Sequence, residues 1–213
     1  MSYRDYTDVF NFKLLKNLQL TKNGFPVVSG IGYIPTKLIP FNYAQSIKDK
    51  RDTGVHFYID DYQFERIWRR PGIYAQILSV FDCVIGPDFS VYTNFPKPLQ
   101  MFNLYKQRLL TAFWQNRGLK VIPNITWSTL EDLPIFLEGL PKYSVVALST
   151  NGCLNKETKT NFLECFNEME KILKPLKILI FGNIPDELKN KNNIVQFNSF
   201  SKRFEILKQR SII

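Results

Sequence analysis

Five short apolar runs, each followed by a small polar cluster, constrain the fold of this chain more than any other feature. The runs are VHFYI, CVIG, KVIP, VVAL and ILIF, and the clusters after them are Asp60-Asp61, Pro87-Asp88, Asn124, Ser149-Thr150-Asn151 and Gly182-Asn183. Runs of four to six β-branched and aromatic residues without polar alternation are typical of strands buried on both faces. Helically spaced stretches separate them, so the sequence predicts strands alternating with helices around a parallel sheet.

The expected elements cover most of the chain. Strands are predicted at 27–28, 55–59, 82–86, 119–123, 144–148, 177–181 and 194–197, and helices at 61–68, 73–80, 98–117, 129–137 and 157–173. Residues 24–43 contain Pro35 and Pro40, and beyond the strand at 27–28 they are expected to be an irregular loop. Residues 1–23 are expected to be a lead-in segment and 200–213 a basic C-terminal helix, so that 1–213 form a single α/β domain.

Two architectures fit this alternation. One is a small or incomplete βα barrel of the TIM type, and the other is an open doubly wound sheet. Polar clusters follow nearly every predicted strand, whereas a doubly wound sheet concentrates its site at one switch point. The pattern therefore favours the barrel, with a site at the carboxyl ends of the strands.

Composition places limits on the class of protein. The 213 residues contain no apolar run long enough to cross a membrane, and the N-terminus does not resemble a signal peptide. Cys83, Cys153 and Cys165 lack CxxC spacing, which favours reduced thiols in a cytoplasmic protein. With His56 as the one histidine, a histidine-based zinc site is not expected; no metal-binding residue and no cofactor are assigned.

The formal charge of +9 is unevenly distributed along the chain. Residues 51–141 carry nine basic and nine acidic side chains, so the whole excess lies in the two flanks. A basic protein attracts polyanions, and nucleic acid or an anionic nucleotide is the expected partner. Even spreading of the charge for solubility alone is the alternative interpretation.

Asp60 and Asp88 are the candidate catalytic residues. Each follows a predicted buried strand, and two carboxylates across a barrel mouth could divide acid and base roles or bind a divalent cation. The alternatives are structural, because Asp61 could cap the helix that begins there and Asp88 could bond to loop backbone.

The other polar clusters are candidates for substrate binding. Asn124 could read a base edge or a sugar hydroxyl, and Trp127 could stack on a base or simply cover the barrel end. The cluster at 149–151 offers hydroxyl and backbone N–H groups to a phosphate, or forms a capping turn. The predicted substrate-binding residues are Asp61, Asn124, Trp127, Ser149, Thr150, Asn151 and Asn183. His56 is expected to be a core residue.

Four blocks carry a resemblance to a known family. FYIDDYQFERIW, FDCVIGPDFSVY, NLYKQRLLTAFWQNRGLKVIPNITW and SVVALSTNG, in this order, resemble the family called domain of unknown function 4417, found in phages, plasmids and bacteria. The resemblance covers roughly residues 25–185 and implies an origin on a mobile element. More distantly, the acids at successive strand ends and the IPN strand are similar to the barrel of transglycosylases that exchange guanine in tRNA or DNA. This chain lacks the cysteine and histidine zinc cluster of those enzymes.

Three functional hypotheses follow, and whether the chain is an enzyme stays open among them. The first is a phage or mobile-element protein that acts on nucleic acid or nucleotides at an N-glycosidic or phosphate linkage. The second is a non-catalytic anti-defence binder that sequesters an anionic nucleotide or a host protein. The third is a DNA-binding accessory protein for replication, whose affinity for DNA would depend steeply on salt.

Overall fold

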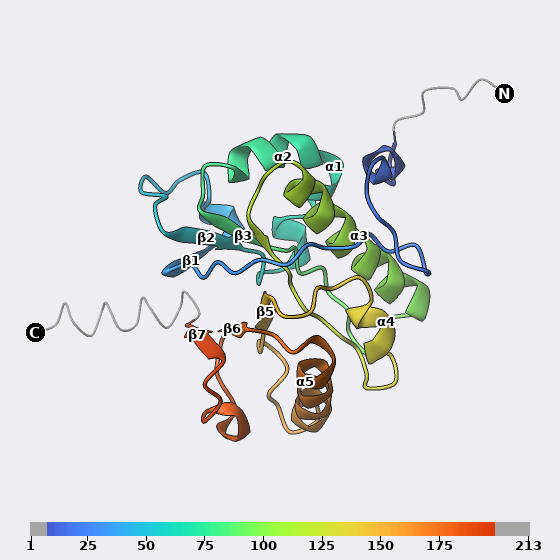
Figure 1. The fold of residues 1–213 in the computed structure, drawn as a ribbon, viewed down its shortest axis with the longest axis vertical. Helices are drawn as coiled ribbons and strands as arrows, with labels where there is room; N and C mark the ends of the chain where they lie inside the picture. Colours follow the sequence, from blue (N-terminus) through green and yellow to red (C-terminus); the bar gives the residue numbers. More distant parts are fainter. Residues whose placement is uncertain (1–7, 199–213) are drawn as a thin grey trace, which may run out of the picture.

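The computed structural model describes residues 8–198, which form a mixed α/β structure with parallel strands in two sheets (Figure 1). The first sheet contains β1 (Lys37–Pro40), β2 (Thr53–His56), β3 (Cys83–Ile85) and β4 (Val121–Ile122). The second sheet contains β5 (Val145–Ser149), β6 (Lys177–Phe181) and β7 (Ile194–Phe197). All strand pairs are parallel, and the spatial order of strands in each sheet follows their order in the chain.

A single bridge joins the two sheets. Asn124, just beyond β4, pairs with Ala147 of β5. The N–H of Ile125 donates to the carbonyl of Ala147 over 2.8 Å, and the N–H of Ala147 donates to the carbonyl of Pro123 over 2.9 Å. The sheets are not closed into a ring, because β1 and β7 each pair with one neighbour.

Helices cover the outer faces of the sheets. They are α1 (Arg66–Arg69), α2 (Pro71–Leu78), α3 (Lys97–Asn116), α4 (Leu133–Leu137) and α5 (Lys159–Leu173), with 3-10 segments η1 (Phe12–Leu15), η2 (Phe41–Tyr43), η3 (Asp61–Gln63) and η4 (Asp186–Leu188). In Figure 1, α1, α2 and α3 lie beside the first sheet and α5 beside the second. Residues of the first three helices share one apolar cluster with β1–β4, and residues of α4 and α5 share another with β5 and β6.

A third apolar cluster lies between the inner faces of the two sheets. Its buried members are Leu38, Tyr58, Cys83, Ile85, Ile122, Val145, Ala147, Leu179 and Phe181, and Val195 and Phe197 of β7 pack against it. Every strand except β2 therefore contributes directly, and Tyr58 joins from the segment just beyond β2. Strands buried on both faces explain why the runs read as continuously apolar.

The prediction for residues 24–43 was wrong in its details. The segment at 27–28 is not a strand, and the backbone bridge there joins Leu20 to Pro26. The real strand, β1, ends at Pro40, where the sequence predicts a loop. Because β1 is an edge strand that pairs with β2 alone, the missing N–H of proline is tolerated.

The other elements agree with expectation in place and type, with small shifts in their ends. The expected helix at 61–68 is interrupted and consists of η3 and α1. Gly118 follows the C-terminal end of α3 with φ +85°, the left-handed conformation that a glycine adopts without strain. The C-terminal helix expected at 200–213 and the first seven residues of the lead-in lie outside the described residues.

Candidate functional site

A cavity of about 540 Å³ opens at the carboxyl ends of four consecutive strands, β2 to β5. Its walls come from the segments that follow these strands, which is where parallel α/β folds carry their sites. The lining residues are 58–62, 88–92, Phe95, 125–127, Leu148, Ser149, Asn151, Cys153 and Phe162. Of the residues singled out from the sequence, Asp60, Asp61, Asp88, Trp127, Ser149 and Asn151 line this cavity, whereas Asn124, Thr150 and Asn183 do not.

Asp88 is the acid in the cavity whose pKa is shifted strongly by its surroundings. It follows β3 and the tight Gly86-Pro87 exit, and its side chain is largely buried. The pKa of Asp88 is raised to about 7, chiefly by burial; a hydrogen bond from Asn124 opposes the rise, and the nearby charge of Asp61 adds to it. A carboxyl group that titrates near neutral pH can both donate and accept a proton under physiological conditions.

Asn124 stands behind Asp88 and does not line the cavity. Its Nδ2 donates to Asp88 Oδ1 over 2.7 Å, and the hydroxyl of Tyr58 donates to its Oδ1 over 2.9 Å. Asn124 is buried, so its amide is engaged with protein groups and is not exposed to a ligand. Gly86 permits this approach, because a Cβ there would lie 3.2 Å from the backbone nitrogen of Asn124.

Asp60 and Asp61 have different surroundings. Asp61 does not cap a helix, which corrects the structural alternative, because its carboxylate accepts hydrogen bonds from the backbone N–H and the hydroxyl of Ser90. It therefore ties the segment after β2 to the segment after β3. Asp60 is exposed at the cavity surface, where Gln63 Nε2 donates to Oδ2 over 3.4 Å.

A buried lysine on α3 lies behind this acidic wall. Lys106 Nζ lies 3.8 Å from the centroid of the Phe89 ring and 3.5 Å from Glu65 Oε2. Burial lowers the pKa of Lys106, and the negative charges of Glu65 and Asp61 oppose that change. A cation so placed compensates part of the negative charge around the cavity without entering its lining.

Three buried amide side chains of α3 hold the segment 89–95, which forms one wall of the cavity. Gln100, Asn103 and Gln107 donate to carbonyl oxygens within that segment over 2.6 to 3.1 Å. These positions recur at i, i+3 and i+7 on one helix face. This polar stripe is a signal that the analysis of apolar periodicity missed.

The cluster after β5 is largely occupied by its own turn. Thr150 is buried, and its hydroxyl donates to the carbonyl of Asn183 over 2.8 Å. The N–H of Asn151 donates to the hydroxyl of Ser149 over 3.1 Å. The helix that follows, α5, begins eight residues later at Lys159. The cluster therefore forms a turn and does not lie at the N-terminus of that helix.

Aromatic side chains make up much of the remaining lining. Trp127 is half-buried, and its ring centroid lies 5.5 Å from that of Phe162. Tyr62 and Tyr92 are 79% and 60% exposed, although both contribute to the cavity. Sequence reasoning did not single out Tyr92 or Phe162, because nothing in the local pattern separates them from core aromatics.

His56 is a core residue in the structure. Its Nδ1 accepts a hydrogen bond from the N–H of Tyr58, and its ring centroid lies 4.2 Å from that of Phe181. Burial lowers the pKa of His56 to about 3, so the ring is neutral at physiological pH. It lies outside the cavity lining.

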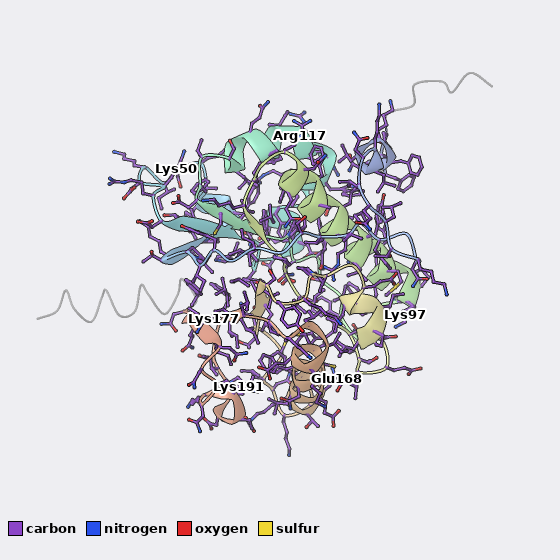
Figure 2. All side chains as sticks on the ribbon, in the orientation of Figure 1. Lys50, Lys97, Arg117, Glu168, Lys177 and Lys191 are labelled. Atoms are coloured by element: carbon purple, nitrogen blue, oxygen red, sulfur yellow. The ribbon has the colours of Figure 1, made fainter. Side chains whose placement is uncertain are left out.

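The positive charge of the protein lies elsewhere. None of the described residues that line the cavity is Lys or Arg. Figure 2 shows the labelled Lys50, Lys97, Arg117, Lys177 and Lys191 well apart from one another on the molecule. Two of them are paired, Lys97 with an aspartate after β4 and Lys191 with a glutamate of α5.

Neither a metal centre nor a membrane span is found in the part of the chain that the structure describes. Between residues 8 and 198, no group of three or more His, Cys, Asp or Glu side chains is arranged to hold a metal ion. Within the same range, no helix is long and apolar enough to cross a bilayer. Cys83, Cys153 and Cys165 are all free thiols.

Comparison with known proteins identifies the family. The family model described as Domain of unknown function (DUF4417) matches residues 21–198, which is most of the chain. The chain belongs to this family. The residues matched to DUF4417 include the strand ends that line the cavity and the whole of α3.

Two curated phage proteins are similar to this DUF4417 chain. The Gene 1 protein of Mycobacterium phage L5 is 30% identical over 155 residues, which cover 71% of this chain and 68% of the relative. The Gene 1 protein of Mycobacterium phage D29 is 27% identical over 155 residues, and the chain spans 57% of that relative's length. No solved structure matches the chain.

Proposed function

We propose that this DUF4417 protein carries out acid/base chemistry at an N-glycosidic linkage of a nucleoside or nucleic-acid substrate bound in the cavity. The observation that carries the proposal is Asp88, a carboxyl group at a strand end with a pKa of about 7. Asp60 and Asp61 lie in the same lining. Carboxyl groups whose surroundings differ in this way can divide the roles of proton donor and charge-stabilising carboxylate.

The cavity favours a glycosidic over a phosphate linkage. Phosphate sites present cations or unpaired N–H groups, whereas this lining presents three carboxylates. At 149–151, where the sequence predicts a phosphate site, one backbone N–H is already taken by a hydroxyl of the same turn. The same electrostatics disfavour an anionic nucleotide and favour a neutral or cationic ring.

The aromatic lining supports a planar ligand. Trp127, Tyr62 and Tyr92 reach the cavity from three different segments, and aromatic faces of this kind stack on nucleobases. Asn151 and Ser149 add hydrogen-bonding groups on the β5 side. Together they match a base and sugar better than an extended charged chain.

We also infer that the two sheets are parts of an incomplete βα barrel. The strands follow chain order, the sheets share an inner apolar cluster, and the cavity lies at the carboxyl ends of the strands. The seam of this barrel would lie between the unpaired edges of β1 and β7, where residues of both strands border a second cavity of about 350 Å³.

Base release is the direct test. The protein is incubated with free nucleosides, single-stranded DNA or single-stranded RNA, and released base is measured by mass spectrometry. Asp88→Asn is expected to lower the rate by roughly 10²–10⁴-fold, as expected for loss of a general acid or base. Asp186→Asn is the matched control, because Asp186 is an exposed acid on η4 outside the cavity.

Two outcomes contradict the proposal. Base release that is equally fast in Asp88→Asn removes Asp88 from the chemistry. A ligand that binds stoichiometrically and is recovered intact favours instead a non-catalytic binder, the second hypothesis from the sequence. Because the relatives are phage proteins and the cysteines are free thiols, the proposal places the chain in the cytoplasm of the host cell.

A further inference from the structure

Asn124 occupies the joint between the two sheets. The backbone hydrogen bonds of Pro123 and Ile125 with Ala147, on either side of Asn124, are the bridge that connects β4 to β5. Its own carbonyl oxygen lies 3.4 Å from the buried guanidinium of Arg108. The backbone that carries this amide is therefore held from both sheets and from α3.

The side-chain amide of Asn124 is fixed in one orientation. Nδ2 faces two acceptors, Asp88 Oδ1 at 2.7 Å and the Pro87 carbonyl oxygen at 3.5 Å, and Oδ1 faces the Tyr58 hydroxyl at 2.9 Å. Turning the amide over would place its oxygen against the Pro87 carbonyl. A primary amide has two N–H donors and a carbonyl oxygen that can accept two hydrogen bonds, and this arrangement uses both donors and one acceptor position.

We propose that Asn124 and Tyr58 are positioning residues that make Asp88 Oδ1 a permanent hydrogen-bond acceptor, so that Oδ2 is the oxygen that exchanges a proton with a ligand in the cavity. When Asp88 is protonated, Oδ1 still accepts from Asn124, and the proton resides on Oδ2. Donation leaves the carboxylate charge on Asp88 and moves the proton to a nitrogen or oxygen of the ligand. That this proton serves catalysis rests on the proposed function, whereas the hydrogen bonds that hold Asp88 Oδ1 do not depend on it.

Other ionisable groups face Asp88 as well. Asp61 approaches from the segment after β2, and its negative charge raises the pKa of Asp88. Tyr58 belongs to the same segment, and Cys153 approaches from the segment after β5; burial raises the pKa of both, and the charge of Asp88 adds to the rise. Tyr58 and Cys153 thus stay neutral at physiological pH, so the proton that titrates near neutrality belongs to Asp88.

The test measures the titration of Asp88 without any substrate. The full chain is labelled with ¹³C at aspartate carboxyl groups, and the Asp88 resonance is assigned by its loss in Asp88→Asn. The wild-type midpoint is expected near pH 7. Asn124→Leu removes the donor that stabilises the charged form, and it should raise the midpoint by about one unit or more.

Tyr58→Phe is the gentler second variant, which keeps the test valid if Asn124→Leu does not fold. It leaves Asn124 Oδ1 without its donor and so loosens the amide that donates to Asp88, and the midpoint should rise by a fraction of a unit to about one unit. Tyr105→Phe on α3 is the control, because Tyr105 lies outside the cavity lining. It should leave the midpoint unchanged.

A midpoint that stays fixed in folded Asn124→Leu or Tyr58→Phe overturns the inference. Failure of the proposed function looks different, since the midpoint would shift while no substrate releases a base. Where base release is found, the alkaline limb of its pH profile should move upward together with the NMR midpoint in both variants. A purely structural role for the two residues would lower the rate without moving that limb.

Discussion

Polar residues follow the strands on both sides of the cavity, but the two sides differ in whether these side chains face the cavity or bond within their own turn. On the side of β2 and β3, Asp60 and Asp88 face the cavity, and Asp88 is held at one carboxyl oxygen. On the side of β5, the hydroxyl of Thr150 donates to a backbone carbonyl, and the Ser149 hydroxyl accepts a hydrogen bond within its own turn. A polar cluster at a strand end therefore indicates a site only where the turn does not consume its hydrogen-bonding groups.

The largest expected effect is a change in the free energy of unfolding with pH, caused by Asp88 on the β2 and β3 side of the cavity. The pKa of Asp88 is about 7 in the folded protein, against 3.8 as the ordinary value for an aspartate. Its folded pKa is raised, so its contribution is fully present below about pH 4 and is lost as the pH rises through about 7. The free energy of unfolding should therefore fall by up to about 4 kcal/mol over that window because of this one group.

Asp88→Asn should abolish this component, because the amide imitates the protonated acid at every pH. Urea denaturation of wild type and variant at pH 4 and pH 8 measures it. The variant is expected to gain stability relative to wild type at pH 8 and to gain little at pH 4. An equal difference at both pH values would show that Asp88 titrates normally and would remove the contrast between the two sides.

Substitutions of one glycine on each side of the cavity are expected to have effects of intermediate magnitude on the free energy of unfolding. A Cβ at Gly86 would lie 2.7 Å from Thr111 Oγ1, and a Cβ at Gly182 would lie 2.5 Å from Thr150 Oγ1. Gly182 also has φ +117°, which strains any other residue. Gly86→Ala and Gly182→Ala should each cost about 1–3 kcal/mol of unfolding free energy, measured by urea denaturation.

The two glycine variants should differ in their effect on Asp88. Gly86 touches the backbone of Asn124, so Gly86→Ala should weaken the bond to Asp88 and raise its titration midpoint. Gly182 packs against the turn at 149–151, so Gly182→Ala should leave that midpoint in place. The same ¹³C titration distinguishes them, and equal shifts in both variants would mean that the two sides of the cavity are not independent.

The smallest effects are expected on the β5 side. Thr150→Val keeps the shape of the side chain and removes its hydrogen bond to the Asn183 carbonyl, which should cost about 1 kcal/mol of unfolding free energy. Ser149→Ala should cost about 1 kcal/mol or less by the same measurement. Neither should alter base release by more than a few-fold. A loss comparable to that of Asp88→Asn would make this turn part of the chemistry.

Much of the fold was readable from the sequence. The strands β6 and β7 lie at the predicted residues 177–181 and 194–197, and α3 (Lys97–Asn116) differs by one residue at each end from the helix predicted at 98–117. The strand β1 was not readable, because Pro35 and Pro40 are loop signals in any local reading. Its pairing with β2 alone makes the proline harmless, and edge position is a property of the assembled sheet.

The sequence predicted where the candidate site lies, at the carboxyl ends of the strands, but it predicted only some of the residues that line it. Asp60 and Asp88 were found because acids that directly follow buried strands stand out against apolar residues. The role of Asn124 behind Asp88 depends on Tyr58, which is 66 residues away and looks like another core aromatic in the sequence. The polar stripe of α3 could not be recognised from apolar periodicity, because its three amide residues carry no apolar signal.

The alternation of buried strands and helices follows from the amino-acid pattern alone, and with it the edge of the sheets at which polar residues gather. Tertiary structure alone decided which of those residues face a cavity, which hold a turn and which orient a neighbour. This difference arises because apolar periodicity is a local property that repeats every few residues along the chain. Desolvation and hydrogen-bond partnership, which set the pKa of Asp88 and the orientation of Asn124, arise only when distant segments are packed together.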